Sequence, residues 1–370
     1  MIEACELAPA WIRSFAAYVP GKPASELARE LGLEESTIVK LASNENPLGP
    51  SPLAVAAMQA ALPEIARYPD GNGYALKQAI VRHLGVDMAQ VVLGNGSNDV
   101  LELAARTFLT PGTGAVYSQH AFAVYALSVQ AMGATHQVVP ARDFGHDLDA
   151  MAAAVRDDTR MLFIANPNNP TGTFVGPDAL RRLLQRVPSR VLVVLDEAYT
   201  EYLSDDDRHD SLPWLSEFPN LLITRTFSKA YGLAGMRVGF ALAHPDVADL
   251  MNRVRQPFNV NLVAQAGAVA SLDDADYLAR SRAVNAEGMA QVLTAMAGFG
   301  VRHIPSRGNF VCIHVGDGAG VYQQLLRRGV IVRPVGGYGM PEWLRVSIGL
   351  PDENERFVTA LGEVLGPRHR

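Results

Sequence analysis

Short apolar runs alternate with helical patterns through the middle of the chain, and this alternation constrains the fold more than any other feature. The runs expected to form buried strands are VVLG (91–94), MLFIAN (161–166), VLVVLDEAY (191–199) and LLITRTFS (221–228). Each is continuously apolar, as in parallel strands with helices on both faces. The helical segments expected among them are 99–108, 177–187 and 246–254. The pattern predicts an α/β sandwich around a mostly parallel or mixed sheet.

The length and a change of pattern predict two domains. At roughly 100–200 residues per domain, a chain of 370 residues is long enough for both. A large α/β domain is expected over 46–262. A smaller α+β domain is expected over 263–370, where a long helical stretch at 263–298 precedes short strands. Residues 1–45 are expected to form an arm and part of the small domain.

Charge and cysteine content exclude several classes of protein. The net charge is −6 with interspersed signs, which does not predict a nucleic-acid surface. No apolar stretch approaches the roughly 18–20 residues of a membrane span, and the acidic N-terminus does not resemble a signal peptide. The two cysteines, Cys5 and Cys312, form no metal-binding, redox or disulfide framework. We therefore expect a cytoplasmic protein without a metal.

Polar loops follow the expected strands, where α/β proteins place ligands. In GNGSND (94–99), two glycines precede Ser97 and Asn98 at the start of a helix. This loop is either an N-capped turn or a site where free N–H groups and the helix dipole hold a phosphate. NPNNPTG (166–172) is either a double turn or a loop that directs the Asn169 amide into a site.

Two charged residues stand in apolar surroundings. Asp196 follows five apolar residues, and a buried carboxylate needs a partner. That partner is either a helix N-terminus or an arginine, or else a protonated heterocyclic nitrogen. Lys229 is the only lysine in TFSKAYGLAGMRVGF (226–240), and a desolvated lysine has a lowered pKa. A neutral amine can form a Schiff base with a carbonyl.

In this order, these motifs resemble those of the fold-type-I pyridoxal-5′-phosphate aminotransferases. The superfamily blocks are NPNNPTG, DEAY and SKAYGLAGMRVGF. Finer blocks resemble histidinol-phosphate aminotransferases: YVPGKP (18–23), LASNENPLGPSP (41–52), RYPDGNG (67–73), GNGSND (94–99) and IVRPVGGYGMPEWLRVSIG (331–349). The resemblance covers nearly the whole chain. It implies a large α/β/α domain with a smaller α+β domain, and pyridoxal 5′-phosphate as the cofactor.

The resemblance also implies roles for individual residues. Lys229 would hold the cofactor and move the proton between substrate and cofactor. Asp196 would pair with the pyridinium nitrogen, and Asn169 and Tyr199 would bind the ring 3-oxygen. The residues implied around the cofactor phosphate are Ser97, Asn98, Thr226, Ser228, Arg237 and, from a second subunit, Tyr68.

The remaining roles concern the ring that stacks on the cofactor and the residues that bind the substrate. An aromatic ring should stack on the cofactor, but SQHAFAVYALS (118–128) departs from the usual family pattern here. Tyr125 is favoured, with Phe122 or His120 as alternatives, and Tyr125 could instead be an aromatic residue of a helix core. Arg345 would bind the α-carboxylate of an amino-acid substrate. Arg333, flanked by apolar residues, would bind a phosphate or a distal carboxylate, with the Tyr18 hydroxyl as a further donor.

The expected activity is transfer of the amino group of L-histidinol phosphate to 2-oxoglutarate, with L-glutamate as product. The first alternative is an aromatic or broad-specificity aminotransferase on the same scaffold. Threonine-phosphate decarboxylases share the fold, and a non-catalytic cofactor-binding regulator would usually carry a DNA-binding extension that this chain lacks. A homodimer with shared active sites is expected, without nucleic-acid or membrane partners.

Overall fold

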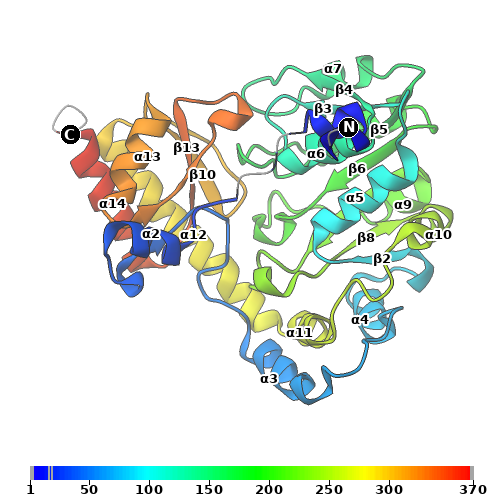
Figure 1. Ribbon diagram of the computed structural model, residues 1–370, viewed down its shortest axis with the longest axis horizontal. Helices are drawn as coiled ribbons and strands as arrows, with labels where there is room; N and C mark the ends of the chain where they lie inside the picture. The colour runs from blue at the N-terminus through cyan, green and yellow to red at the C-terminus, as the bar shows by residue number, and fades with distance from the viewer. Residues whose placement is uncertain (1–3, 16, 18–19, 367–370) are drawn as a thin grey trace.

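Two domains lie side by side in the computed structural model, which describes residues 4–15, 17 and 20–366. Figure 1 shows the large domain, mostly cyan to green, beside the small orange and red domain. The long helix α12 (Ala275–Phe299) runs from the small domain towards helix α11 (Leu262–Leu272) at the base of the large one. None of the described helices is long and apolar enough to cross a bilayer.

A seven-stranded mixed sheet forms the centre of the large domain. Its strand order is β2-β8-β7-β6-β5-β3-β4, and β8 alone runs antiparallel to the rest of the sheet. The strands are β2 (Val91–Gly94), β3 (Gly114–Ser118), β4 (Thr135–Val139), β5 (Thr159–Ala165), β6 (Leu192–Asp196), β7 (Leu221–Thr226) and β8 (Gly239–Ala243). The predicted α/β fold with a mostly parallel sheet is confirmed.

Helices cover both faces of this sheet, so its strands are buried on both sides. On one face pack α5 (Ser97–Phe108), α6 (Ala123–Ala131) and α10 (Pro245–Val254). The other face carries α3 (Pro52–Ala61), α4 (Tyr74–Leu84), α7 (Leu148–Ala153), α8 (Pro177–Arg186), α9 (Trp214–Glu217) and α11. This double cover explains why the strand sequences are continuously apolar.

Local capping signals set the helix boundaries. Ser51 Oγ accepts a hydrogen bond from the Ala54 N–H at 3.0 Å and Pro52 occupies the first helical position, as the sequence predicts for α3. The single helical stretch expected at 263–298 is wrong, because α11 ends at Leu272 and α12 begins at Ala275. The Asp274 side chain accepts from the Tyr277 N–H and thereby starts a new helix.

The small domain is built on a four-stranded antiparallel sheet in the order β12-β13-β10-β9. Its strands are β9 (His303–Ile304), β10 (Phe310–His314), β12 (Arg333–Pro334) and β13 (Trp343–Ser347), with helices α2 (Ala24–Leu31), α12, α13 (Gly318–Leu326) and α14 (Pro351–Leu365) around it. A separate parallel pair joins β1 (Val39–Lys40) to β11 (Val330–Ile331). This pairing draws the N-terminal segment onto the small domain.

The first described residues pack against the large domain. Helix α1 (Ala10–Arg13) lies against α6, where the Gln130 amide donates to the Trp11 carbonyl at 2.8 Å. The remaining turns are 3-10 helices η1 (Ala4–Leu7), η2 (Glu35–Thr37), η3 (Leu62–Glu64), η4 (Met88–Gln90), η5 (Thr200–Tyr202), η6 (Ala234–Met236) and η7 (Gly336–Tyr338). Helix α1 therefore contacts the large domain, whereas α2 and β1 pack on the small domain.

Candidate active site

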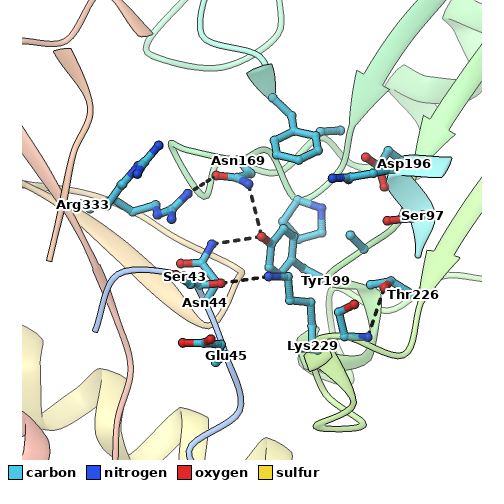
Figure 2. Close-up of a pocket in the computed structure, with 18 of the residues that line it drawn as sticks. Ser43, Asn44, Glu45, Ser97, Asn169, Asp196, Tyr199, Thr226, Lys229 and Arg333 are labelled. Carbon is cyan, nitrogen blue, oxygen red and sulfur yellow. Dashed lines mark hydrogen bonds between the residues drawn. The ribbon is translucent and has the colours of Figure 1, made fainter. Parts of the chain in front are cut away.

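A cavity of about 240 Å³ opens where the carboxyl ends of β5, β6 and β7 face the small domain. The register of the sheet brings these ends to one level, because Ala165 pairs with Asp196 and Asp196 with Thr224. Figure 2 shows Asp196, Ser97 and Thr226 on one side of Lys229, and Asn44, Glu45 and Arg333 on the other. The pocket thus has a large-domain wall and a wall from the small domain and the N-terminal segment.

Lys229 lies at the centre of this pocket, in the loop after β7. Its Nζ donates a hydrogen bond to the Ser43 carbonyl at 3.0 Å. Burial lowers the pKa of Lys229 to about 7, and the positive charge of Arg345 acts in the same direction. Near neutral pH a large share of this amine is unprotonated, so it can act as a nucleophile.

Asp196 ends β6 and is only 4% exposed. Its Oδ1 accepts from the Thr224 hydroxyl at 2.9 Å, and its Oδ2 accepts from the Tyr125 hydroxyl at 2.8 Å. Burial raises the pKa of Asp196, while these hydrogen bonds lower it in part. The carboxylate also lines the pocket, so its remaining acceptor capacity is available to a ligand.

A hydrogen-bonded network joins the two walls. The Tyr199 hydroxyl accepts from the Asn169 amide at 3.3 Å and from the Asn44 amide at 3.0 Å. Asn169 Oδ1 accepts in turn from Arg345 Nη1 at 2.6 Å. Burial raises the pKa of Tyr199 to about 12, so its hydroxyl keeps its proton and can donate to a ligand.

Asn44 is a pocket residue that sequence reasoning missed. Its backbone has φ of 54°, a left-handed conformation that asparagine tolerates better than most residues. Ser347 fixes it there, accepting from the Asn44 N–H at 2.8 Å and donating to its Oδ1 at 3.0 Å. The sequence block 41–52 contained it, but only the contacts across the pocket single it out.

The start of α5 forms a cup suited to an anion. Gly96 precedes the helix with φ of +83°, and no side chain caps the first-turn N–H groups of Ser97 and Asn98. A Cβ at Gly96 would collide with the Arg237 guanidinium, so only glycine admits the arginine here. Arg237 Nη1 also donates to Ser228 Oγ at 3.2 Å.

Two arginines from neighbouring small-domain strands face the same pocket. Arg333 and Arg345 are directly opposite each other in the β12–β13 pair, so both side chains project from one face of the sheet. Arg345 is 6% exposed, and its Nη2 donates to the Ala42 carbonyl at 2.7 Å. Its Nε has no hydrogen-bond partner among the described residues. A buried unpaired donor of this kind fits an anionic ligand.

The expected stacking role of Tyr125 needs correction. Tyr125 is fully buried behind Asp196 and stacks on Phe163 with ring centroids 4.7 Å apart. Phe122, one helical turn earlier, lines the pocket instead. His120 bonds to the Tyr338 carbonyl through Nδ1 and does not line the pocket. Of the three rings considered from the sequence, the structure thus brings only Phe122 to the cavity.

Two other expected residues lie away from the cavity. Tyr68 is 82% exposed and stacks on Phe258, with ring centroids 4.7 Å apart. It does not line the pocket of its own chain. Tyr18 lies outside the described residues.

The family described as aminotransferase class I and II matches residues 36–361. The chain belongs to this family. It is 63% identical to a histidinol-phosphate aminotransferase of Methylobacillus flagellatus, covering 98% of each chain. It is 62% identical to histidinol-phosphate aminotransferase 1 of Thiobacillus denitrificans, covering 97% of this chain and 93% of that protein.

A solved structure supports the same assignment. Histidinol-phosphate aminotransferase from Sinorhizobium meliloti, crystallised in complex with pyridoxal 5′-phosphate, superimposes with a TM-score of 0.89 at 30% identity and 96% coverage of both chains. Membership of this aminotransferase family implies pyridoxal 5′-phosphate as the cofactor of this chain too.

The pocket residues fit that cofactor. The cup at Gly96 and Arg237 matches a phosphate, Asp196 offers a buried acceptor, and Lys229 offers an amine of lowered pKa. Among the described residues, no group of three His, Cys, Asp or Glu side chains is arranged to hold a metal ion. The aminotransferase pocket is thus assembled from three strand ends, one helix N-terminus and two small-domain strands.

Proposed function

We propose that this aminotransferase transfers the amino group of L-histidinol phosphate to 2-oxoglutarate, giving imidazole-acetol phosphate and L-glutamate in histidine biosynthesis. The observation that carries the proposal is the position of Lys229 between an anion cup and Asp196 on one side and two arginines on the other. The high identity to histidinol-phosphate aminotransferases supports this substrate over an aromatic amino acid.

On the large-domain wall, the proposed roles concern the cofactor. When bound, pyridoxal 5′-phosphate supplies an aldehyde carbon that accepts an amine and a ring that withdraws electrons. Lys229 holds that carbon and, once released, moves the proton at the substrate carbon that bears nitrogen. Asp196 binds the ring nitrogen, and Tyr199 and Asn169 bind the ring oxygen. Phe122 packs against the ring.

The phosphate of the cofactor is proposed to bind at the N-terminus of α5. The first-turn N–H groups of that helix would donate to the phosphate, and the Arg237 guanidinium would neutralise its charge. The side chains proposed to complete the cup are those of Ser97, Asn98, Thr226 and Ser228. They hold the cofactor while Lys229 is detached from it.

The other wall is proposed to recognise substrate anions. Arg345 binds the α-carboxylate of glutamate through its unpaired Nε and its neighbouring Nη atoms. Histidinol phosphate has no α-carboxylate, so its phosphate binds the same pair of cations, chiefly Arg333. Arg333 also takes the distal carboxylate of glutamate, and the Tyr18 hydroxyl adds a donor.

A shared active site in a homodimer is part of the proposal. Exposed apolar side chains gather between residues 53 and 74, namely Leu53, Leu62, Ile65, Tyr68 and Tyr74. An exposed apolar group of this kind favours a protein partner, and a second copy of the chain is the simplest one. Tyr68 would then reach the cofactor phosphate of the other subunit. Neither Cys5 nor Cys312 forms a disulfide in the described part of the chain, which suits the proposed cytoplasmic location.

Mixing two inactive variants tests the shared site. We expect partial activity from heterodimers of Lys229→Ala and an impaired Tyr68→Ala chain, because one of the two sites in each heterodimer would be intact. Full activity of an isolated monomer, measured together with sedimentation, would contradict the shared site.

Half-reactions test the substrate directly. The holoenzyme is mixed separately with histidinol phosphate, phenylalanine and glutamate, and the loss of cofactor absorbance is followed. We expect histidinol phosphate and glutamate to react efficiently and phenylalanine much more slowly. A higher kcat/KM for phenylalanine would replace the proposed substrate with an aromatic amino acid.

A further inference from the structure

We propose that Tyr125 is a positioning residue that keeps Asp196 ionised and oriented towards the cofactor ring nitrogen. The inference rests on the proposed cofactor role of Asp196 and assigns Tyr125 a function other than ring stacking. Tyr125 would act through the carboxylate and would touch neither substrate nor cofactor.

Packing around the Tyr125 ring directs its hydroxyl at the Asp196 carboxylate. Its hydroxyl donates to Asp196 Oδ2 at 2.8 Å, and the side chain is completely buried. Its ring stacks on Phe163 of β5 and meets Phe122 edge to face, with centroids 5.8 Å apart. The phenol is therefore held by packing on two sides while its oxygen is directed at the carboxylate.

One turn of helix α6 carries both rings. Phe122 is the N-cap residue and lines the pocket, whereas Tyr125 points inward behind Asp196. The Tyr125 N–H also donates to the Phe122 carbonyl at 3.0 Å, which fixes the turn. A shift of this turn would move the Phe122 ring in the pocket together with the Tyr125 hydroxyl that donates to Asp196.

The carboxylate needs such support because burial favours its neutral form. The pKa of Asp196 is raised chiefly by burial and also by the negative charge of Glu197, and the hydrogen bonds from Tyr125, Thr224 and the backbone of Ala198 oppose this. Tyr125 cannot supply a proton itself, because burial and the Asp196 charge raise its own pKa well above the ordinary value. It remains a neutral donor throughout the working pH range.

Loss of this donor has a defined consequence. A carboxylate with one fewer hydrogen bond binds a proton more tightly, so it would draw the proton from the ring nitrogen onto its own oxygen. The ring would then withdraw electrons less strongly from the reacting carbon. A hydrogen bond to a charged group corresponds to about a ten- to hundredfold effect on rate.

The test uses the holoenzyme loaded with pyridoxal 5′-phosphate labelled with ¹⁵N in the ring. Tyr125→Phe should move the ring ¹⁵N signal towards the unprotonated position and slow the glutamate half-reaction about tenfold or more. The matched control is Tyr117→Phe, which removes the hydroxyl of another buried tyrosine, bonded to His136 at 2.7 Å and not part of the pocket lining. It should leave the ¹⁵N signal and the rate unchanged.

Three further variants keep the test decisive. Thr224→Val removes the donor to Oδ1 and should move the ¹⁵N signal in the same direction, whereas Thr224→Ser should not. If Tyr125→Phe does not fold, 4-aminophenylalanine at position 125 keeps the ring and offers a weaker donor, and the ¹⁵N signal should move in the same direction as expected for Tyr125→Phe.

An unchanged ¹⁵N signal in Tyr125→Phe, or in the 4-aminophenylalanine protein where Tyr125→Phe does not fold, would overturn the proposal. The ¹⁵N measurement requires bound cofactor but no substrate, so an error in the proposed substrate leaves it readable. Failure of the unmodified chain to bind the cofactor would overturn both this inference and the proposed function.

Discussion

The two walls of the pocket are built in different ways. Lys229, Asp196 and the cup at Gly96 belong to strand ends and a helix start within one sheet. Arg333, Arg345 and Asn44 come from the small domain and the segment after β1. The first wall is fixed by backbone hydrogen bonds along the sheet, and the second by side-chain contacts across the domain boundary.

Under the proposed function, this difference separates the residues that perform the chemistry from those that recognise the substrate. The large-domain wall carries the amine of lowered pKa and the buried carboxylate, whose geometry depends on one continuous core. The other wall carries two cations suited to different anions. Changes to the first wall should affect every substrate, whereas changes to the second should depend on the substrate.

The largest effect is expected from Lys229→Ala. Without the amine, turnover should fall by several orders of magnitude with every substrate, while the cofactor still binds through its phosphate. Borohydride reduction of the unmodified holoenzyme should attach the pyridoxyl mass to the peptide that contains Lys229. Mass on another lysine would contradict the assignment.

The second-largest loss of turnover is expected from Asp196→Asn. An amide keeps the shape of the side chain but not the charge, so the ring nitrogen loses its anionic partner. We expect kcat to fall on the order of a hundred- to a thousandfold for both histidinol phosphate and glutamate. Steady-state kinetics together with a melting curve measure this, and near-normal kcat would make Asp196 a structural residue.

Arg333→Ala should affect substrates unequally. Loss of one charge-assisted contact should lower kcat/KM for histidinol phosphate about ten- to a hundredfold and leave phenylalanine nearly unchanged. Arg327→Ala, an exposed arginine of the same domain, is the control and should alter neither value. An equal decrease with both substrates would assign Arg333 to the scaffold and remove the contrast between the walls.

The smallest expected effect is the pH dependence of the rate at which Lys229 captures the cofactor. Because the pKa of Lys229 is lowered to about 7, its neutral form predominates above that pH. The rate at which the cofactor-free chain captures pyridoxal 5′-phosphate should rise about tenfold between pH 6 and pH 8 and level off above it. Stopped-flow absorbance measures this rate. A rise that continues to pH 10 would mean an ordinary lysine.

The large-domain wall could be read largely from the sequence. Asp196 and Lys229 follow continuously apolar runs, and parallel strands bring such positions to one edge of a sheet. The glycine loop before α5 was a candidate anion site in the sequence, with a capped turn as the alternative, and the described residues provide no side-chain cap there. Local chain geometry is sufficient for these residues, since each follows its own strand end.

Only the tertiary structure decided which aromatic ring enters the pocket and which residues complete the second wall. Phe122 and Tyr125 lie in one turn of α6, and the packing of that helix on β5 determines which of them faces the cavity. Asn44 and Arg345 meet Tyr199 and Asn169 only after segments distant in the chain have docked. Sequence patterns specify periodicity and strand ends, whereas helix rotation and domain contacts depend on packing between distant residues.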